Sequence, residues 1–241
     1  MAQLIDGKAI SQQIKDELKA EVEALRNDGT DICLAVIQVV ELVKELNADD
    51  TVNGILVQLP LPAQIDEDKI IRTISADKDV DGFHPESVGR LWIGEKGFLS
   101  CTPAGVIQLL KRSGIEIAGK ECVIIGRSNI VGKPMAALLL RENGTVTVAH
   151  SRTKNLADVT RRADILIVAI GKERFITSDY VKEGAVVIDV GMHRDAENHL
   201  CGDVDFADVE PVASAITPVP GGVGPMTIAM LMNNCVETVR S

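Results

Sequence analysis

The sequence of 241 residues is poor in aromatic side chains, which make up 2% of it, and it has no C-x-x-C pair. The scarcity of aromatics argues against binders of single-stranded nucleic acid, because those proteins stack bases on aromatic rings. An odd number of scattered cysteines indicates reduced thiols in a cytoplasmic protein rather than a disulfide framework or a zinc site. The five are Cys33, Cys101, Cys122, Cys201 and Cys235. The histidines show no metal-ligand spacing, and His193 and His199 are expected in a polar, exposed turn, so we expect no metal site.

The chain also has fewer basic than acidic residues. It contains 25 Lys and Arg and 35 Asp and Glu, which gives a net charge of -10. This balance argues against a nucleic-acid or anionic-membrane binder, although a local nest of N–H groups with one arginine can still bind a small anion. Long apolar runs are missing too, and the run from Ile165 to Ile170 is too short to span a bilayer. Asp6 and the lack of a sustained apolar run near the N-terminus predict no signal peptide. Hydrophobic residues nevertheless reach 46%, which predicts an aliphatic core.

The middle of the chain predicts a parallel α/β sheet. Short aliphatic runs typical of buried strands alternate with helical segments, and this alternation indicates right-handed crossovers. The predicted strands are 121–125, 145–149, 164–170 and 185–190, and the predicted helices are 134–142, 156–162 and 178–183.

The first hundred residues predict further α/β structure. A helix is expected over 8–28, strands over 32–39 and 55–59, and a helix over 66–75. Residues 77–85 are expected to form a polar loop and 91–97 an irregular connector, with Thr102 as the cap of the next helix and Pro103 at its first position. A last helix is expected over 226–239.

A seam interrupts this pattern between Val39 and Val40. The strand ending at Val39 runs directly into a segment that reads as the end of an amphipathic helix, and no turn residue separates them. A parallel crossover needs a connection at this point, and loops favour Gly, Pro, Asn or Asp. The pattern therefore indicates that a connecting segment is missing at this seam.

A glycine turn follows the first strand of the alternating region. Gly126 permits a tight bend, Gly132 permits close helix packing, and the start of the next helix offers free N–H groups to a phosphate. Ser128 stands where the usual dinucleotide fingerprint has its middle glycine. The position of the turn in a βαβ series favours a dinucleotide site over an ordinary strand-to-helix connection.

The end of the second strand favours NADP over NAD. An NAD site usually has an acid here for the adenine ribose, whereas this chain has His150, Ser151, Arg152 and Thr153. A hydroxyl beside a cation suits a 2′-phosphate, and Arg127 can add a second positive group. The alternative is that Ser151 and Arg152 are ordinary turn residues.

Three further features each have a structural and a functional interpretation. Gln58, at the end of a strand, is either satisfied by neighbouring backbone or directed into a ligand cleft. The acids of residues 77–81 form a solvated turn, or one of them turns inward to hold the N–H groups of a ligand; the spacing does not fit a calcium loop. The loop over 218–225 is a rigid connector, or its glycines let backbone approach a ligand closely.

Eight strings along the chain, in order, resemble the bifunctional methylenetetrahydrofolate dehydrogenase/methenyltetrahydrofolate cyclohydrolase family. They cover nearly the whole chain, and several are long and specific. They are GILVQLPLP at 54–62, DKDVDGFHP at 77–85, CTPAG at 101–105, VIIGRSNIVGKP at 123–134, TVTVAHSRT at 145–153, GAVVIDVGM at 184–192, GDVDF at 202–206 and ITPVPGGVGPMT at 216–227.

The resemblance implies an α/β protein of two domains and a homodimer active in one-carbon metabolism. Residues 1–101 and 226–241 would form the folate-binding domain, completed by the C-terminal helix, and residues 102–225 a Rossmann-like, parallel-sheet NADP domain. The family oxidises methylenetetrahydrofolate with NADP and hydrolyses the methenyl product to formyltetrahydrofolate.

The resemblance also implies roles for individual residues. Gln58 and Asp81 would be the catalytic pair, with Asp81 binding the pterin ring. The folate site would be lined by Val57, Gln58, Leu59, Asp81, Pro220, Gly221, Gly222, Val223 and Gly224. The cofactor would be held by Gly126, Arg127, Ser128, Ser151 and Met192.

One departure from the family pattern is serious. The family carries a Tyr-x-x-x-Lys helix after the strand matching 32–39, with a lysine that activates water or polarises the folate and a tyrosine that stacks on the substrate. This chain has no such motif, and its single tyrosine is Tyr180. The gap falls at the seam between Val39 and Val40. A true deletion is disfavoured because a parallel sheet that loses an internal element would expose strand edges and core, and it would predict loss of the cyclohydrolase activity.

Two rival functions remain at this point. One is another NADP dehydrogenase of small acids, similar to shikimate dehydrogenase, which would need a lysine–aspartate pair that the N-terminal region does not show. The other is a non-catalytic relative that binds a ligand or forms a dimer.

Overall fold

The computed structural model describes residues 2–27, 34–36, 40–62 and 64–240. These residues divide into two compact units, which we describe separately. Unit 1 comprises Met1–Gln12 and Thr102–Ile228, and unit 2 comprises Gln13–Cys101 and Ala229–Ser241. No helix within the described ranges is long and apolar enough to cross a membrane.

Unit 1 is built on a parallel sheet in which six strands follow the order β1-β10-β7-β6-β4-β5. The four predicted strands form its centre and one edge, and Ile125 pairs with both Ala149 and Val168. Most of their side chains are aliphatic and buried on β4, β6 and β7, as expected of strands covered on both faces. The strands are β1 (Gln3–Leu4), β4 (Glu121–Ile125), β5 (Thr145–Ala149), β6 (Ile165–Val168), β7 (Val186–Asp189) and β10 (Ala215–Ile216).

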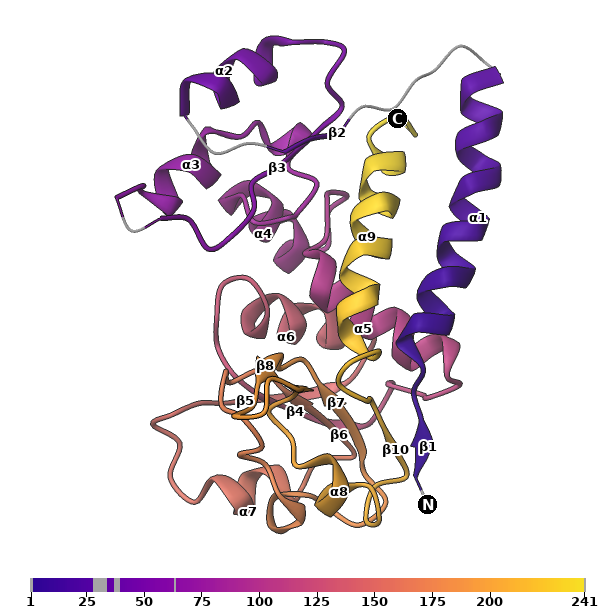
Figure 1. Ribbon diagram of the computed structural model, residues 1–241, viewed down its shortest axis with the longest axis vertical. Helices are drawn as coiled ribbons and strands as arrows, with labels where there is room; N and C mark the ends of the chain where they lie inside the picture. Colours follow the sequence, from indigo (N-terminus) through magenta and orange to yellow (C-terminus); the bar gives the residue numbers. More distant parts are fainter. Residues whose placement is uncertain (1, 28–33, 37–39, 63, 241) are drawn as a thin grey trace. The chain divides into compact units, whose positions relative to one another are not determined.

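Helices lie on both faces of this sheet, with α6 on one side and α7 and α8 on the other (Figure 1). This arrangement confirms the predicted Rossmann-like domain. The remaining elements of the unit include a short hairpin of β8 and β9 after β7. Their bounds are α5 (Cys101–Arg112), α6 (Gly132–Arg141), α7 (Leu156–Thr160), η2 (Ser178–Tyr180), β8 (His193–Arg194), β9 (Leu200–Cys201) and α8 (Phe206–Val209).

Unit 2 contains a parallel pair of strands, β2 and β3, in which Leu34 lies opposite Gly54. Helix α2 connects the two strands, and its Val43 is fully buried in a small aliphatic cluster with Ile55 and Ile70. The elements are β2 (Leu34–Val36), α2 (Val40–Ala48), β3 (Gly54–Leu56), α3 (Glu67–Thr73), η1 (Ala76–Lys78) and α4 (Pro85–Ile93). The long helices α1 (Gly7–Asn27) and α9 (Val223–Glu237) each have one part in each unit.

The prediction for residues 77–97 is wrong at α4, because a helix occupies Pro85–Ile93 where a loop end and a connector were expected. The Nδ1 atom of His84 accepts a hydrogen bond from the Glu86 N–H at 3.1 Å and caps this helix. Histidine is an unusual cap, which is why the start was missed. Gly94, with φ of 79°, ends the helix in a left-handed conformation.

The helix start expected at Thr102 lies at Cys101 instead, and the Thr102 hydroxyl lies 2.9 Å from the Thr227 hydroxyl. The last helix begins at Val223, inside the segment expected to be a loop.

The domain boundaries also differ at the N-terminus, where residues 1–101 were expected to lie outside the Rossmann-like domain. Strand β1 pairs with β10, and Gln3 lies opposite Ala215, so the first residues complete the sheet of unit 1. At the C-terminal end the units divide within α9, after Ile228 rather than before residue 226. A two-residue strand is too short for a periodic pattern, so the sequence could not predict it.

Candidate functional site

The glycine turn of unit 1 requires both of its glycines. Gly126 has a φ of 133°, and a Cβ there would lie 2.2 Å from the carbonyl oxygen of Ala169. A Cβ on Gly132 would lie 2.3 Å from the carbonyl oxygen of Gly126. The backbone of β4, the following loop and α6 therefore approach one another as a dinucleotide turn demands.

Ser128 has a local structural role in this turn. Its hydroxyl oxygen accepts hydrogen bonds from the N–H groups of Val131 at 3.1 Å and Gly132 at 3.3 Å. The first amides of α6, expected to be free for a phosphate, are thus partly satisfied within the chain. Sequence reasoning missed this turn-stabilising role because the serine was compared with a glycine.

A cavity of about 420 Å³ opens beside the glycine turn. Three of the predicted residues line it, together with the last residue of β4 and the segments that follow β5 and β6. The lining residues are Ile125, Gly126, Arg127, His150, Ser151, Thr153, Leu156, Ala169, Ile170, Lys172, Phe175 and Tyr180. Ligands of open α/β sheets bind at this carboxyl end of the strands.

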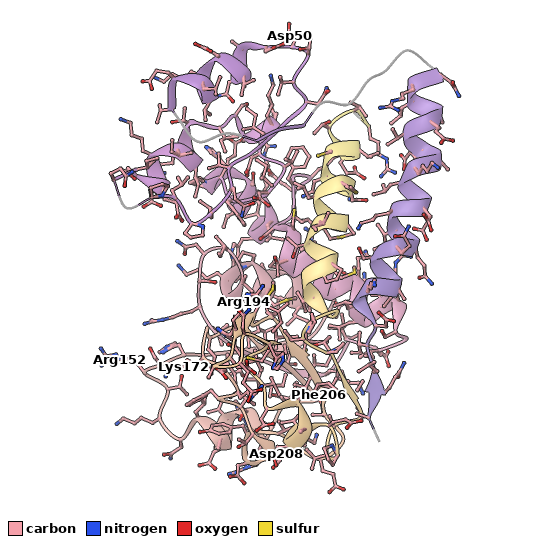
Figure 2. The ribbon with its side chains drawn as sticks, viewed as in Figure 1. Asp50, Arg152, Lys172, Arg194, Phe206 and Asp208 are labelled. Atoms are coloured by element: carbon pink, nitrogen blue, oxygen red, sulfur yellow. The ribbon has the colours of Figure 1, made fainter. Side chains whose placement is uncertain are left out.

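The cavity suits an anion. No carboxylate is among its described lining residues, and neither Arg127 nor Lys172 forms an ion pair within the described part of the chain. Arg152, next to Ser151, extends away from the unit into solvent (Figure 2). The chain has a net charge of -10, but these two unpaired cations make the electrostatic potential at this cavity positive.

Two buried aspartates fix the loops around the carboxyl ends of β6 and β7. Asp203 is fully buried, and its carboxylate accepts hydrogen bonds from the N–H groups of residues 170, 171 and 172 at 2.7, 3.2 and 2.7 Å. Asp189 accepts from the N–H groups of Asp203 at 3.0 Å and Val204 at 2.9 Å. Burial raises the pKa of Asp189 to about 6, and these hydrogen bonds oppose the rise.

Sequence reasoning missed both aspartates and misplaced His193. The expected exposed turn is a hairpin, and the His193 Nε2 lies 2.7 Å from a carboxylate oxygen of Asp203. His199 is exposed, as expected. The strings GAVVIDVGM and GDVDF contained the two aspartates, but nothing in either string indicates that their partners are backbone groups far along the chain.

The loop over 218–225 packs against the start of α1 within unit 1. A Cβ on Gly7 would lie 1.8 Å from the carbonyl oxygen of Gly222, and the Lys8 N–H donates to the carbonyl oxygen of Gly221 at 2.9 Å. The Cε of Met192 lies 3.7 Å from where a Cβ on Gly224 would be. Met192 thus lies beside this loop, and it is not among the lining residues of the cavity.

In unit 2, Gln58 is exposed, and its amide donates to the carbonyl oxygen of Leu59 at 3.0 Å. The local backbone contact corresponds to the structural alternative, and the role of Gln58 in the folate site stays a prediction. Val57 is 4% exposed and belongs to the aliphatic core, against which Leu59 packs. The strand end thus presents Gln58 outward and holds its neighbours inward.

Of the acids in 77–81, Asp79 turns inward and satisfies the chain itself. Its carboxylate accepts from the His84 N–H at 2.8 Å and from the Ser87 hydroxyl at 2.7 Å. Asp81 is half-buried, and burial, reinforced by the charge of Asp79, raises its pKa to about 6. A hydrogen bond with the Cys101 thiol opposes that rise. The carboxylate oxygens of Asp79 are already occupied by hydrogen bonds from the chain. Asp81 still has lone pairs free to accept hydrogen bonds, which fits a ligand contact.

Comparison with known proteins identifies the family to which this chain belongs. A family model described as the NAD(P)-binding domain of tetrahydrofolate dehydrogenase/cyclohydrolase matches residues 100–241, and the catalytic-domain model of the same family matches residues 38–81. The chain belongs to the tetrahydrofolate dehydrogenase/cyclohydrolase family.

Individual relatives of this family are close. The bifunctional protein FolD of Lachnoclostridium phytofermentans is 63% identical, covering 98% of this chain and 97% of that protein. The crystal structure of the bifunctional FolD from Campylobacter jejuni has a TM-score of 0.97 at 46% identity, covering 100% of this chain and 99% of that one. A Trypanosoma brucei FolD structure, complexed with NADP cofactor and inhibitor, has a TM-score of 0.91 at 35% identity and covers 99% and 97%.

The same comparisons bear on the seam. The alignment to the FolD of Agathobacter rectalis is 60% identical over 278 positions and covers 100% of both chains, whereas this chain has 241 residues. The difference, 278 against 241, leaves about 37 positions of that family member without a counterpart here. The catalytic-domain model begins to match at residue 38, next to the seam. Val39 itself lies outside the described residues, and the helix α2 begins at Val40.

Proposed function

We propose that this chain is an NADP-dependent methylenetetrahydrofolate dehydrogenase and methenyltetrahydrofolate cyclohydrolase, and that a true deletion at the seam would remove the second of these activities. The observation that carries the proposal is the cavity beside the glycine turn, which unites Gly126, Arg127 and Ser151 without a carboxylate. An NAD site would favour an acid at the end of β5 for the ribose hydroxyls. The NADP bound in the Trypanosoma brucei relative supports the same choice.

The residues of unit 2 supply the contacts proposed for the folate. Asp81, when ionised, would accept hydrogen bonds from the N–H groups of the pterin ring, and the exposed Gln58 would orient the substrate or a water. Pro220, Gly221, Gly222, Val223 and Gly224 are proposed to border the reacting carbon. Met192, beside Gly224, is proposed to lie along the cofactor.

The oxidation needs alignment more than acid–base chemistry. The methylene carbon gives up a hydride and becomes a methenyl cation, while the neighbouring folate nitrogens donate electron density to it. NADP supplies the hydride acceptor when it is bound. The role of the protein is to hold the donor carbon in line with that acceptor and to exclude water.

The hydrolysis needs a base or a polarising group, since water must attack the methenyl carbon and lose a proton. An amide does not titrate usefully, so Gln58 cannot be that base. The family lysine belongs to the Tyr-x-x-x-Lys motif, which this sequence lacks. A true deletion at the seam therefore predicts that the chain retains the oxidation and loses the hydrolysis, and that the missing tyrosine weakens folate binding.

An absorbance assay of NADPH formation with methylenetetrahydrofolate, run in parallel with NAD, tests the proposal. We expect turnover with NADP, slower turnover with NAD, and accumulation of the methenyl product. No reduction of either nucleotide would favour the non-catalytic alternative. Turnover of a small hydroxy acid instead of the folate would favour the other NADP dehydrogenase.

We also propose that the protein forms a homodimer in the cytoplasm, as its family resemblance implies. The four described cysteines are free and buried, which supports a reducing compartment. Strand β5 is the last strand at one edge of the sheet of unit 1, and its Val148 is exposed, so this edge is a candidate contact surface for a second copy of the chain. Sedimentation analysis of the purified chain, with a monomer mass of 25.8 kDa, tests the oligomeric state.

A further inference from the structure

Lys172 is the lining cation of the cavity to which neither the sequence nor the family resemblance gave a role. It lies after β6, whereas the predicted cofactor residues lie after β4, β5 and β7. Its side chain makes no ion pair within the described residues, and its one recorded contact is with the ring of Phe175. A lysine left without an acid partner, in a chain rich in acids, is available for an anionic ligand.

Two of the few aromatic residues of the chain hold this lysine in place. The Lys172 Nζ lies 4.9 Å from the centre of the Phe175 ring, within the range of a cation–π interaction. The Phe175 ring in turn lies 5.7 Å from that of Tyr180, at an interplanar angle of 42°. Both rings line the same cavity, so the ammonium group is tethered at its wall.

The backbone of Lys172 is anchored by a buried carboxylate, although the residue itself is exposed. The Lys172 N–H donates to the fully buried carboxylate of Asp203 at 2.7 Å, together with the N–H groups of the two residues before it. Asp189 holds the N–H of Asp203 itself at 3.0 Å. This chain of hydrogen bonds links the position of Lys172 to the centre of the sheet.

We propose that Lys172 is a specificity-determining residue that binds the 2′-phosphate of NADP together with Arg127 and Ser151. The inference rests on the proposed cofactor site and deepens it. Phe175 acts as a positioning residue, because it sets where the ammonium group lies. Lys172 does not raise the affinity for a ligand that lacks the 2′-phosphate. It therefore favours the binding of NADP over that of NAD.

The experiment compares two nucleotides that differ only in the 2′-phosphate, adenosine 2′,5′-bisphosphate and AMP. Their affinities for the full chain are measured by titration calorimetry at low salt, so no catalysis is involved. The Lys172→Met variant should bind the bisphosphate about tenfold more weakly and AMP within about twofold of the original chain. Lys172→Arg should restore most of the loss, and Phe175→Leu should lower bisphosphate affinity about threefold.

Lys120→Met is the matched control, since Lys120 is an exposed lysine at the opposite end of β4. It should leave both affinities unchanged. Equal weakening of both nucleotides by Lys172→Met would place the lysine at the 5′-phosphate and overturn the inference, as would no weakening of either. If the original chain does not prefer the bisphosphate to AMP, the NADP preference itself fails.

Discussion

The sheets of the two units differ in how complete they are. Unit 1 has a parallel sheet of six strands, and β4, β6 and β7 each have a neighbour on both sides. The described sheet of unit 2 is a pair, β2 and β3, with α2 between them in the chain. A family model matches all of 100–241, whereas the model of the other domain matches only from residue 38.

This difference between the units separates the requirements for binding the cofactor from the requirements for hydrolysing the methenyl product. The glycine turn, the cavity and the buried aspartates of unit 1 are all present. The carboxylate proposed for the pterin remains in unit 2, while the segment that would carry the family lysine does not. Under our proposal, a true deletion at the seam would remove a chemical step although β2, α2 and β3 remain.

The largest expected effect comes from restoring the missing segment. Inserting the corresponding residues of the Lachnoclostridium phytofermentans relative between Val39 and Val40 should raise hydrolysis of the methenyl folate by about 10²- to 10⁴-fold, the range of a general acid–base group. The measurement is the decay of methenyltetrahydrofolate absorbance. A Gly/Ser insertion of equal length is the control, and rapid hydrolysis by the chain without any insertion would refute our assignment.

The second prediction concerns the anchoring carboxylate of unit 1. Asp203→Asn replaces an acceptor of several hydrogen bonds with a group that also donates, so we expect a loss of about 3 kcal/mol in the free energy of unfolding. Urea denaturation followed by circular dichroism measures it. Asp179→Asn, at an exposed acid without a recorded side-chain partner, should change stability by less than about 0.5 kcal/mol. Similar effects of the two changes would contradict the role of Asp203.

The third prediction uses the pKa of Asp81, which burial raises from 3.8 to about 6. Its protonated form stabilises the fold; this stability is complete below pH 3.8 and is lost as the pH rises through 6. Between pH 4 and 7 the original chain should therefore lose about 2–3 kcal/mol relative to Asp81→Asn. The pKa of Asp189 in unit 1 is also raised, so its titration changes the stability of both chains in the same way. Subtracting the stability of Asp81→Asn from that of the original chain removes this shared contribution and leaves the effect of Asp81 in unit 2. A difference that does not vary with pH would disprove the assignment.

The smallest effect is expected at the start of α1. In Gly7→Ala the new methyl group would collide with the carbonyl oxygen of Gly222, so the loop over 218–225 must shift. We expect kcat of the oxidation to fall about tenfold, as a small misplacement of reacting groups can cause, with NADP affinity unchanged. Gly89→Ala is the control, because a Cβ there meets nothing within 4 Å. An unchanged kcat in Gly7→Ala would show that the loop position does not matter.

The sequence predicted the centre of unit 1 because β4, β6 and β7 are continuous aliphatic runs between helices. It did not predict α4, whose cap is a histidine, or β1, which is too short to have a period. The anchoring by Asp203 was beyond reach for a different reason. Its partners are backbone N–H groups 31 to 33 positions away, and such contacts leave no residue pattern.

In the candidate site, Gly126, Arg127 and Ser151 line one cavity, which the sequence could suggest because a strand end fixes where its next residues lie. Their role in binding the cofactor stays a prediction. The sequence did not predict that the amide of Gln58 is exposed to solvent. Lys172 and Phe175 share the cavity only through the neighbouring positions of β4 and β6 in the sheet, which no local motif encodes.

The scarcity of aromatic residues has a practical consequence for such experiments. The single tryptophan, Trp92, lies on α4 in unit 2, and the single tyrosine, Tyr180, lines the cavity of unit 1. Each half of the chain therefore carries one intrinsic fluorophore with its own emission band. Nucleotide titrations followed through the tyrosine and folate titrations followed through the tryptophan would report on the two halves separately, without any attached dye.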